Sequence, residues 1–188
     1  EAEMAAEMER LEEMADAHRQ QLKTAGADVT VNYGFSPSDG VFGEFNLRGT
    51  VGYLDEFEFL PANGGIVDNE RGEIGYPKWV GTADVTWELK DVILNYGVQY
   101  VGEQLRFERD AIAGDPDIAA PEFLTLGDRF VHDFRAEFRT GVDRAGFFVG
   151  VNNFTNELPS RGLSNAPVSW LGRFFYAGIR VNTDQLGF

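Results

Sequence analysis

The feature that most constrains this chain is a period-two alternation of apolar and polar residues, which begins after Gly26 and recurs in seven stretches. Most stretches run for about ten residues, whereas strands of soluble proteins average about five or six and membrane-crossing strands need about 9–11. We therefore predict an all-β fold, an antiparallel transmembrane β-barrel segment of about seven long strands. The expected apolar positions are Val29, Val31, Tyr33 and Phe35; Phe45, Leu47, Val51 and Tyr53; Trp79, Ala83, Val85, Trp87 and Leu89; Val92, Leu94, Tyr96, Val98 and Tyr100; Phe130, His132, Phe134, Ala136 and Phe138; Phe147, Val149 and Val151; and Phe175, Ala177, Ile179 and Val181.

The connections between these stretches alternate between short and long. The short ones lie at 36–42, 90–91 and 141–145, and the long ones at 55–77, 103–128 and 154–170. Outer-membrane barrels have short periplasmic turns and long extracellular loops. With the long loops outside, the first and last strands both run toward the periplasm.

This orientation predicts one band of aromatic residues, or girdle, at each membrane interface. A soluble sandwich has no reason to place aromatic residues in two bands separated by Leu, Val and Ala. The extracellular girdle would comprise Tyr53, Trp79, Tyr100 and Phe130, and the periplasmic girdle Phe35, Phe45, Trp87 and Phe138.

The first residues follow a different period. Met4, Met8, Leu11 and Ala15 recur at a spacing of three and four among strong helix formers, which predicts an amphipathic acidic helix over 1–21. We expect this helix to be a loop or extension at the extracellular rim. The remaining region, 22–188, would then hold the C-terminal strands of an outer-membrane β-barrel.

Four segments resemble TonB-dependent receptors. Val151-Asn-Asn-Phe-Thr-Asn-Glu157 followed by Pro159 is similar to their penultimate strand, and Gly172-Arg-Phe-Phe-Tyr-Ala-Gly-Ile-Arg-Val181 is similar to their final strand. The segment 22–29 resembles the opening of a late barrel strand, and Tyr96-Gly97 with Tyr100-Val101-Gly102 also fits the pattern. The resemblance covers 22–182, and it implies the last seven of about twenty-two strands around an internal plug.

The resemblance implies a receptor that imports a scarce ligand, such as an iron chelate, a cofactor or a glycan, across the outer membrane of a Gram-negative bacterium. The implied partners are the rest of the barrel and the plug, the TonB complex acting through the plug, the barrel assembly machinery, and outer-membrane lipid and lipopolysaccharide. Phe188 would be the aromatic signal for barrel assembly, although 183–187 separates it from Val181, the last apolar residue of the final strand.

Seven strands leave two open edges, and open edges in hydrocarbon leave backbone groups unpaired at several kcal/mol each. Either the sequence contains one further strand, or neighbouring strands come from outside this sequence. Two alternatives remain open at this point. One is a small self-contained barrel, an adhesin or a passive pore, and the other is a soluble β-sandwich binding module.

Candidate ligand contacts are aromatic and charged residues of the long loops, although packing of loop against loop is the more common role for any one such residue. These candidates are Phe57, Phe59, Arg106, Phe107, Arg109, Phe123, Arg161 and Trp170.

Several functional classes find no support. A net charge of −15 offers no footprint for nucleic acid, and the absence of cysteine excludes disulfides and thiolate metal sites. His18 and His132 lie far apart, and the spacing of Asp110, Asp115 and Asp117 does not match a calcium loop. Asp84 and Glu88 share a strand face and are best explained as polar residues of a barrel interior. We therefore expect no metal, no cofactor and no enzymatic activity.

Overall fold

The computed structural model describes residues 7, 8, 10, 21–61, 65–140, 145–159 and 169–181. Glu7, Met8 and Arg10 are helical, and most of the helix predicted over 1–21 lies outside the described residues. Its last position is corrected by the structure, because Gln21 is the first residue of a strand. No helix among the described residues is both long enough and apolar enough to cross a membrane.

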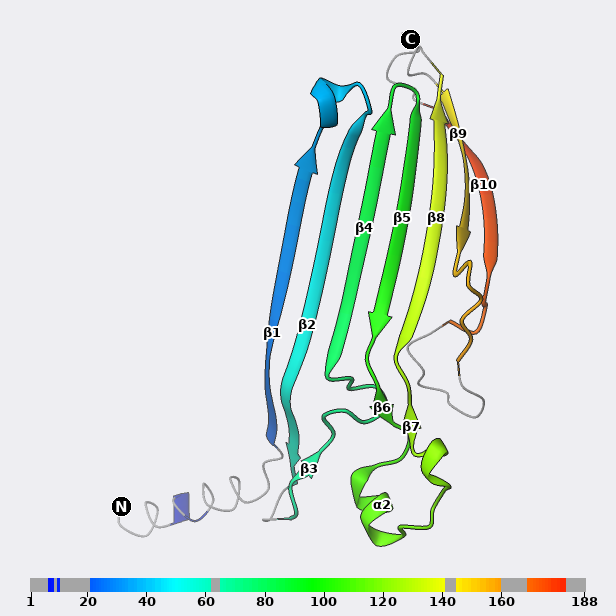
Figure 1. The fold of residues 1–188 in the computed structure, drawn as a ribbon. Helices are drawn as coiled ribbons and strands as arrows, with labels where there is room; N and C mark the ends of the chain where they lie inside the picture. The colour runs from blue at the N-terminus through cyan, green and yellow to red at the C-terminus, as the bar shows by residue number, and fades with distance from the viewer. Residues whose placement is uncertain are drawn as a thin grey trace.

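The described residues form a large antiparallel sheet in which seven long strands follow one another in chain order (Figure 1). A two-residue strand, β3 (Asp68–Asn69), pairs with the end of β2 and is the eighth strand of this sheet. The predicted all-β class and the number of long strands are therefore confirmed. The long strands are β1 (Gln21–Phe35), β2 (Glu44–Leu60), β4 (Trp79–Leu89), β5 (Val92–Val101), β8 (Arg129–Arg139), β9 (Ala145–Asn152) and β10 (Phe174–Val181).

The strand register gathers the alternating apolar residues on one face. Residues that pair across an antiparallel ladder point to the same side of the sheet, so a chain of such pairs traces a row across one face. One row crosses all seven long strands through Phe35, Phe45, Trp87, Leu94, Ala136, Val149 and Ala177. The adjacent row on the opposite face crosses them through Gly34, Asn46, Thr86, Asn95, Arg135, Gly150 and Tyr176.

No second layer of the described chain covers the apolar face, although the Phe154 ring in the turn after β9 lies 5.5 Å from His132 and 6.4 Å from Tyr96. Val29, Val31 and Ile179 are 61%, 59% and 76% exposed, and Leu126 is the one buried hydrophobic side chain among the described residues. Within the part of the chain that the structure describes, the sheet therefore lacks the second layer that gives a soluble domain its core.

The opposite, inner face is polar over most of its width but carries three aromatic rings, Phe148, Phe174 and Tyr176, near its last edge. Phe148 lies over Gly178 and Tyr176 lies over Gly150, and a Cβ at either glycine would collide with the ring. The Arg135 guanidinium lies 4.1 Å from the centre of the Phe148 ring and donates to Glu137 at 2.7 Å. The rings thus fill the space that the glycines leave open.

The first two short turns lie together at one end of the sheet and the first two long connections at the other (Figure 1). The first short turn contains η1 (Pro37–Gly40), and in the second turn Lys90 adopts a φ of 54°. The third turn, predicted at 141–145, lies outside the described residues except for Ala145.

The long connections carry small elements of their own. Residues 102–128 hold α2 (Arg109–Gly114), η2 (Pro121–Phe123) and a small sheet of β6 (Gln104–Leu105) and β7 (Thr125–Leu126). The first long loop begins later than predicted, because β2 continues to Leu60 through pairing with a β1 that begins at Gln21.

Candidate functional site

A β-bulge at Asp55 reverses the two faces of β2 near its loop end. Gly26 pairs with Leu54 and Ala25 pairs with Glu56, so Asp55 is an extra residue between two paired positions. Before the bulge, the apolar face carries residues up to Tyr53. Beyond it, that face carries Glu56 and Glu58, and the Lys23 ammonium of β1 binds the Glu56 carboxylate.

The same reversal turns aromatic residues to the inner face. Phe57 and Phe59 pair with Thr24 and Leu22, which continue the inner face of β1. The Phe57 ring stacks on Tyr76 with centroids 4.2 Å apart and planes 26° apart. We call Leu22, Phe57, Phe59 and Tyr76 the inner aromatic wall.

A carboxylate lies at the edge of this wall. The Glu70 amide donates to the Phe57 carbonyl at 3.1 Å, which fixes Glu70 beside the stacked pair. The nearby Glu70 carboxylate raises the pKa of the Tyr76 hydroxyl, and burial adds to this effect. The wall therefore combines exposed ring surface with negative charge.

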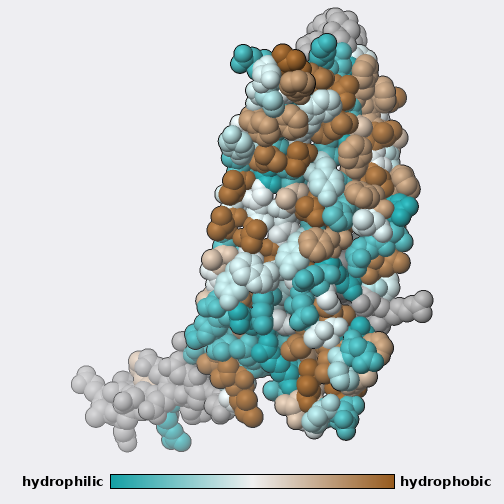
Figure 2. Space-filling view, in the orientation of Figure 1, coloured by the Kyte–Doolittle hydropathy of each residue, from teal (hydrophilic) through white to brown (hydrophobic). Residues whose placement is uncertain are grey.

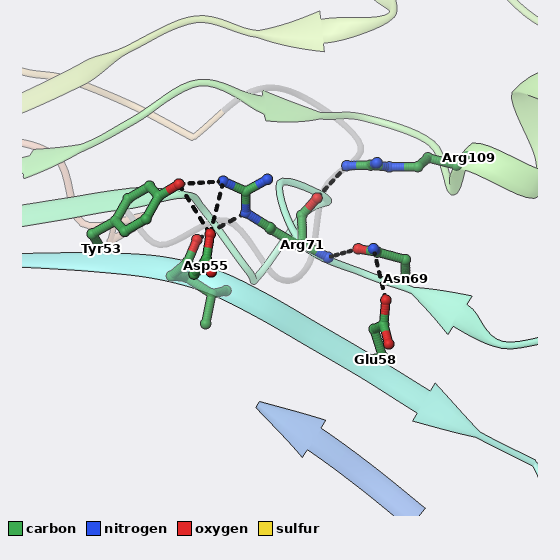
Figure 3. A network of polar contacts seen from close by, with 7 residues as sticks. Tyr53, Asp55, Glu58, Asn69, Arg71 and Arg109 are labelled. Carbon is green, nitrogen blue, oxygen red and sulfur yellow. Dashed lines mark hydrogen bonds and ion pairs between the residues drawn. The ribbon is translucent and has the colours of Figure 1, made fainter. Parts of the chain in front are cut away.

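Arg71 ties the first long loop to the outer side of β2 (Figure 3). Its guanidinium donates to the Tyr53 hydroxyl at 2.6 Å and to the Leu54 carbonyl at 2.9 Å, and it lies 5.5 Å from the centre of the Tyr53 ring. The Arg71 amide donates to the Asn69 side chain at 3.1 Å, which in turn donates to Glu58 at 3.4 Å. Because the partners of the Arg71 guanidinium and amide lie in β2 or β3, these contacts hold the loop against the sheet.

A second set of contacts, which we call the loop joint, joins the first two long loops. Glu73 forms a parallel bridge with Leu105, and its carboxylate accepts from the Arg109 amide at 2.9 Å. The Arg109 guanidinium lies 3.8 Å from the same carboxylate and also donates to the Arg71 carbonyl. The Gly75 amide donates to the Gln104 side chain at 2.8 Å. The two loops therefore form one folded unit.

Burial governs the electrostatics of the loop joint. Glu73 is 5% exposed, and burial raises the pKa of its carboxyl above the ordinary 4.5. The hydrogen bond from the Arg109 amide acts in the opposite direction, and the nearby Asp68 carboxylate raises the pKa further. The folded loops therefore favour the protonated form of Glu73 more than the unfolded chain does.

The residues after β9 close a turn around Asn153. The Asn153 side chain accepts from the Glu157 amide at 2.7 Å and donates to the Glu157 carbonyl at 2.6 Å. Its own amide donates to Asp133 of β8 at 2.7 Å, and Asn156 accepts from the Arg173 amide at 3.0 Å. This turn connects the loop ends of β8, β9 and β10.

The predicted ligand contacts occupy several different environments. Phe57 and Phe59 belong to β2 and not to a loop, because the β1–β2 hairpin is longer than the alternation indicated. Arg109 supports the loop joint, and the Arg106 Nε atom is buried with no hydrogen-bond partner among the described residues.

The other predicted contacts lie in the second and third long connections. Phe107 lies between β6 and α2, Phe123 ends η2 at 55% exposure, and Trp170 is 61% exposed shortly before β10. Neither Phe123 nor Trp170 stacks with another aromatic ring of the described chain. Arg161 and Phe188 lie outside the described residues.

The predicted girdle residues form ring contacts at both ends of the apolar face. At the loop end, Tyr53 lies 4.5 Å from Trp79, and Tyr100 lies 5.0 Å from Phe130. At the short-turn end, Phe35 lies 5.0 Å from Phe45, Phe45 lies 6.5 Å from Trp87, and Phe138 lies 5.5 Å from Phe147.

Sequence reasoning missed Asp55, Glu70, Arg71, Glu73 and Tyr76. One local signal was present, because Glu73 lies between Gly72 and Gly75, whose φ values of 81° and 96° belong to tight turns. Nothing local indicated its partner Arg109, which follows 36 positions later. Among the described residues, no group of three or more His, Cys, Asp or Glu side chains is arranged to hold a metal ion.

Comparison with known proteins gives a likeness in fold. No protein-family model matches the chain, and no curated protein matches it. A crystal structure of a mutant ferric enterobactin receptor from Pseudomonas aeruginosa is similar, with a TM-score of 0.52 and 12% identity over 84% of this chain. The chain spans about a fifth of that receptor, since 22% of its length is covered. The likeness shows a shared fold and supports a barrel-type sheet.

Proposed function

We propose that this chain forms part of the wall of a TonB-dependent outer-membrane receptor, which imports a scarce ligand into the periplasm. The observation that carries the proposal is the strand register, which unites the apolar residues of seven strands on one exposed face. Aromatic contacts border this face at both ends. Such an exterior suits lipid, whereas a soluble protein rarely exposes an apolar patch larger than a few hundred Å².

The height of the apolar face also supports a membrane. Eight residue steps separate Phe45 from Tyr53 along β2, which is about 27 Å of strand. A tilt of about 40° reduces this to about 21 Å, close to the roughly 25 Å apolar band of outer-membrane barrels. In this view, hydrophobic residues are frequent over the upper part of the strands, where they are mixed with neutral and hydrophilic ones, and hydrophilic residues gather over the lower ends of β1 and β2 (Figure 2).

The direction of the edge strands argues against a barrel closed by this sheet alone. Six successive antiparallel pairings connect β1 to β10, so the two strands run in the same direction. Direct pairing of β1 with β10 would add a parallel ladder to an otherwise antiparallel wall. The proposal therefore assigns their neighbours to a remainder of the barrel outside the described residues.

In this proposal the long loops and the inner aromatic wall face the ligand from the extracellular side. Transport energy comes from the TonB complex acting through a plug that this sequence does not contain. The chain itself performs no chemistry, and its contribution is to build the wall and present the loops.

Single cysteines test the placement in lipid, because the chain has no cysteine of its own. Val98 lies on the apolar face and Gln99 on the inner face of β5. In native membranes, Val98→Cys should resist a hydrophilic maleimide and Gln99→Cys should react, while both should react after denaturation. Equal reactivity of the two cysteines in native membranes would refute the membrane placement.

The intact mass of the native protein, extracted from the outer membrane with detergent, tests the receptor itself. A mass several times the 20.9 kDa of this chain is expected for a large receptor. A mass close to 20.9 kDa would favour the small self-contained barrel and overturn the receptor proposal.

A further inference from the structure

The extracellular side of the proposed receptor wall carries a strong excess of negative charge. Residues 55–78 contain six carboxylates against two cationic side chains, and residues 103–128 contain seven against two. Such a surface attracts cations and repels anions over a range set by the ionic strength.

The inner aromatic wall lies within this negative field and has the chemistry that cations prefer. Phe57 and Tyr76 are stacked, and Tyr76 remains 37% exposed, so ring surface is open beside the stack. The carboxylate that raises the pKa of Tyr76 belongs to Glu70, which is fixed next to the pair by its backbone bond to Phe57. Aromatic faces beside a carboxylate are a recurrent arrangement for binding quaternary ammonium groups.

We propose that Phe57, Tyr76 and Glu70 bind the cationic group of a small organic cation, such as a quaternary or aromatic ammonium, which belongs to the ligand of the receptor. The proposal rests on the proposed function, because it assigns a chemical class to the imported ligand. The same site should bind an anionic chelate more weakly than a cation, since an anion would meet the ring faces and the Glu70 carboxylate without a countercharge.

The bulge at Asp55 is what creates this site. Without the extra residue, Phe57 would share a face with Tyr53, and Glu56 and Glu58 would face inward. The bulge therefore turns the aromatic residues to the ligand side at the level where the apolar face ends.

Two soluble aromatic ions of similar size and opposite charge test the proposal. Phenyltrimethylammonium and benzenesulfonate are titrated against the protein in a non-ionic detergent at fixed ionic strength, and binding is followed by NMR. We expect the cation to bind at least about fivefold more tightly than the sulfonate. Equal affinities, or tighter binding of the sulfonate, would overturn the proposal.

Variants locate the binding. Phe57→Ala and Glu70→Gln should each weaken phenyltrimethylammonium about fivefold, whereas Phe123→Ala, which removes an exposed ring elsewhere in the loops, should have no effect. Phe57→Leu keeps apolar volume in β2 but removes the ring, so it decides the result if Phe57→Ala fails to fold. Unchanged cation binding in Phe57→Leu and Glu70→Gln would exclude this site.

The experiment separates this inference from the proposed function. Binding is measured on isolated protein and requires neither a plug nor the TonB complex. If the protein binds the cation probe but supports no energised import, the receptor proposal alone is refuted. If the protein imports a ligand but binds the two probes equally, this inference alone is refuted.

Discussion

Ala83→Arg tests the lipid-facing surface most directly. Ala83 belongs to a row that runs from Val31 through Gly49 and Ala83 to Val98, halfway between the rows of Phe45 and Tyr53. Four residue steps on either side give about 13 Å of strand, or about 10 Å of depth at a tilt near 40°. Ala83 therefore lies near the midplane of the proposed membrane span.

An arginine on the lipid face at the midplane costs about 2–4 kcal/mol, and near an interface it costs about 0–1 kcal/mol. We expect Ala83→Arg to lower the folding equilibrium in lipid by about 30-fold to 1,000-fold. The matched control is Thr82→Arg, because Thr82 lies at the same depth on the inner face between Thr50 and Gln99. The control should change stability by less than about 1 kcal/mol.

The assay is denaturant unfolding of the native protein in lipid vesicles, followed by the difference in gel mobility between folded and heat-denatured protein. The free energies of unfolding of the two variants are compared with that of the parent. An Ala83→Arg cost below about 0.5 kcal/mol, or an equal cost for Thr82→Arg, would show that this face does not meet lipid.

The remaining predictions concern the loops and the last strands. Glu73→Ala should weaken the loop joint by about 1–3 kcal/mol because it leaves the Arg109 amide without its acceptor, and hydrogen exchange of 70–76 should rise accordingly. Since the pKa of Glu73 is raised in the folded loops, its stabilising contribution is complete below the ordinary pKa of 4.5 and is lost as pH rises through the folded pKa. Glu73→Gln should abolish that pH dependence in the same exchange experiment, and a dependence that persists would assign it to another group. Asn153→Ala should destabilise the turn after β9 by about 1–3 kcal/mol, and Asn153→Gly should cost less because glycine tolerates the φ of 51°; equal unfolding midpoints would contradict this order. Gly150→Ala should cost about 1–3 kcal/mol because the new methyl group displaces the Tyr176 ring. The control Val149→Ala, on the opposite face of β9, should leave that ring in place, and near-ultraviolet circular dichroism reports the difference.

The sequence alone was sufficient to predict the long strands, because the alternation of apolar and polar residues is a local signal. Val98 and Gln99 differ in polarity within a single dipeptide, and the period of a strand alone assigns them to opposite faces. The same reasoning failed beyond Asp55, where Phe57 has the parity of Tyr53 but points to the other side. A bulge is decided by the pairing of β2 with β1, and no property of residues 53–57 fixes it in advance.

The candidate site was less accessible for a related reason. The contact between Glu73 and Arg109 joins two loops that are distant in sequence, and it forms only because β4 and β5 bring their loop ends together. Phe57 was identified as a candidate from its residue type, but its stacking on Tyr76 depends on the same long-range arrangement. Local patterns therefore predicted the long strands and their two faces well, and the contacts between the loops poorly.

The exposed apolar face has a consequence for how sequences with this fold diverge. A core residue must fit its neighbours in shape, so its replacement costs a cavity or an overlap in addition to transfer from water. Phe134 and Val149 face outward and meet no opposing protein layer among the described residues, so in a fluid surrounding only their polarity is constrained. Such positions can exchange Phe, Leu, Val and Ile freely over evolutionary time. Two chains can then retain one fold while agreeing at only 12% of their aligned residues.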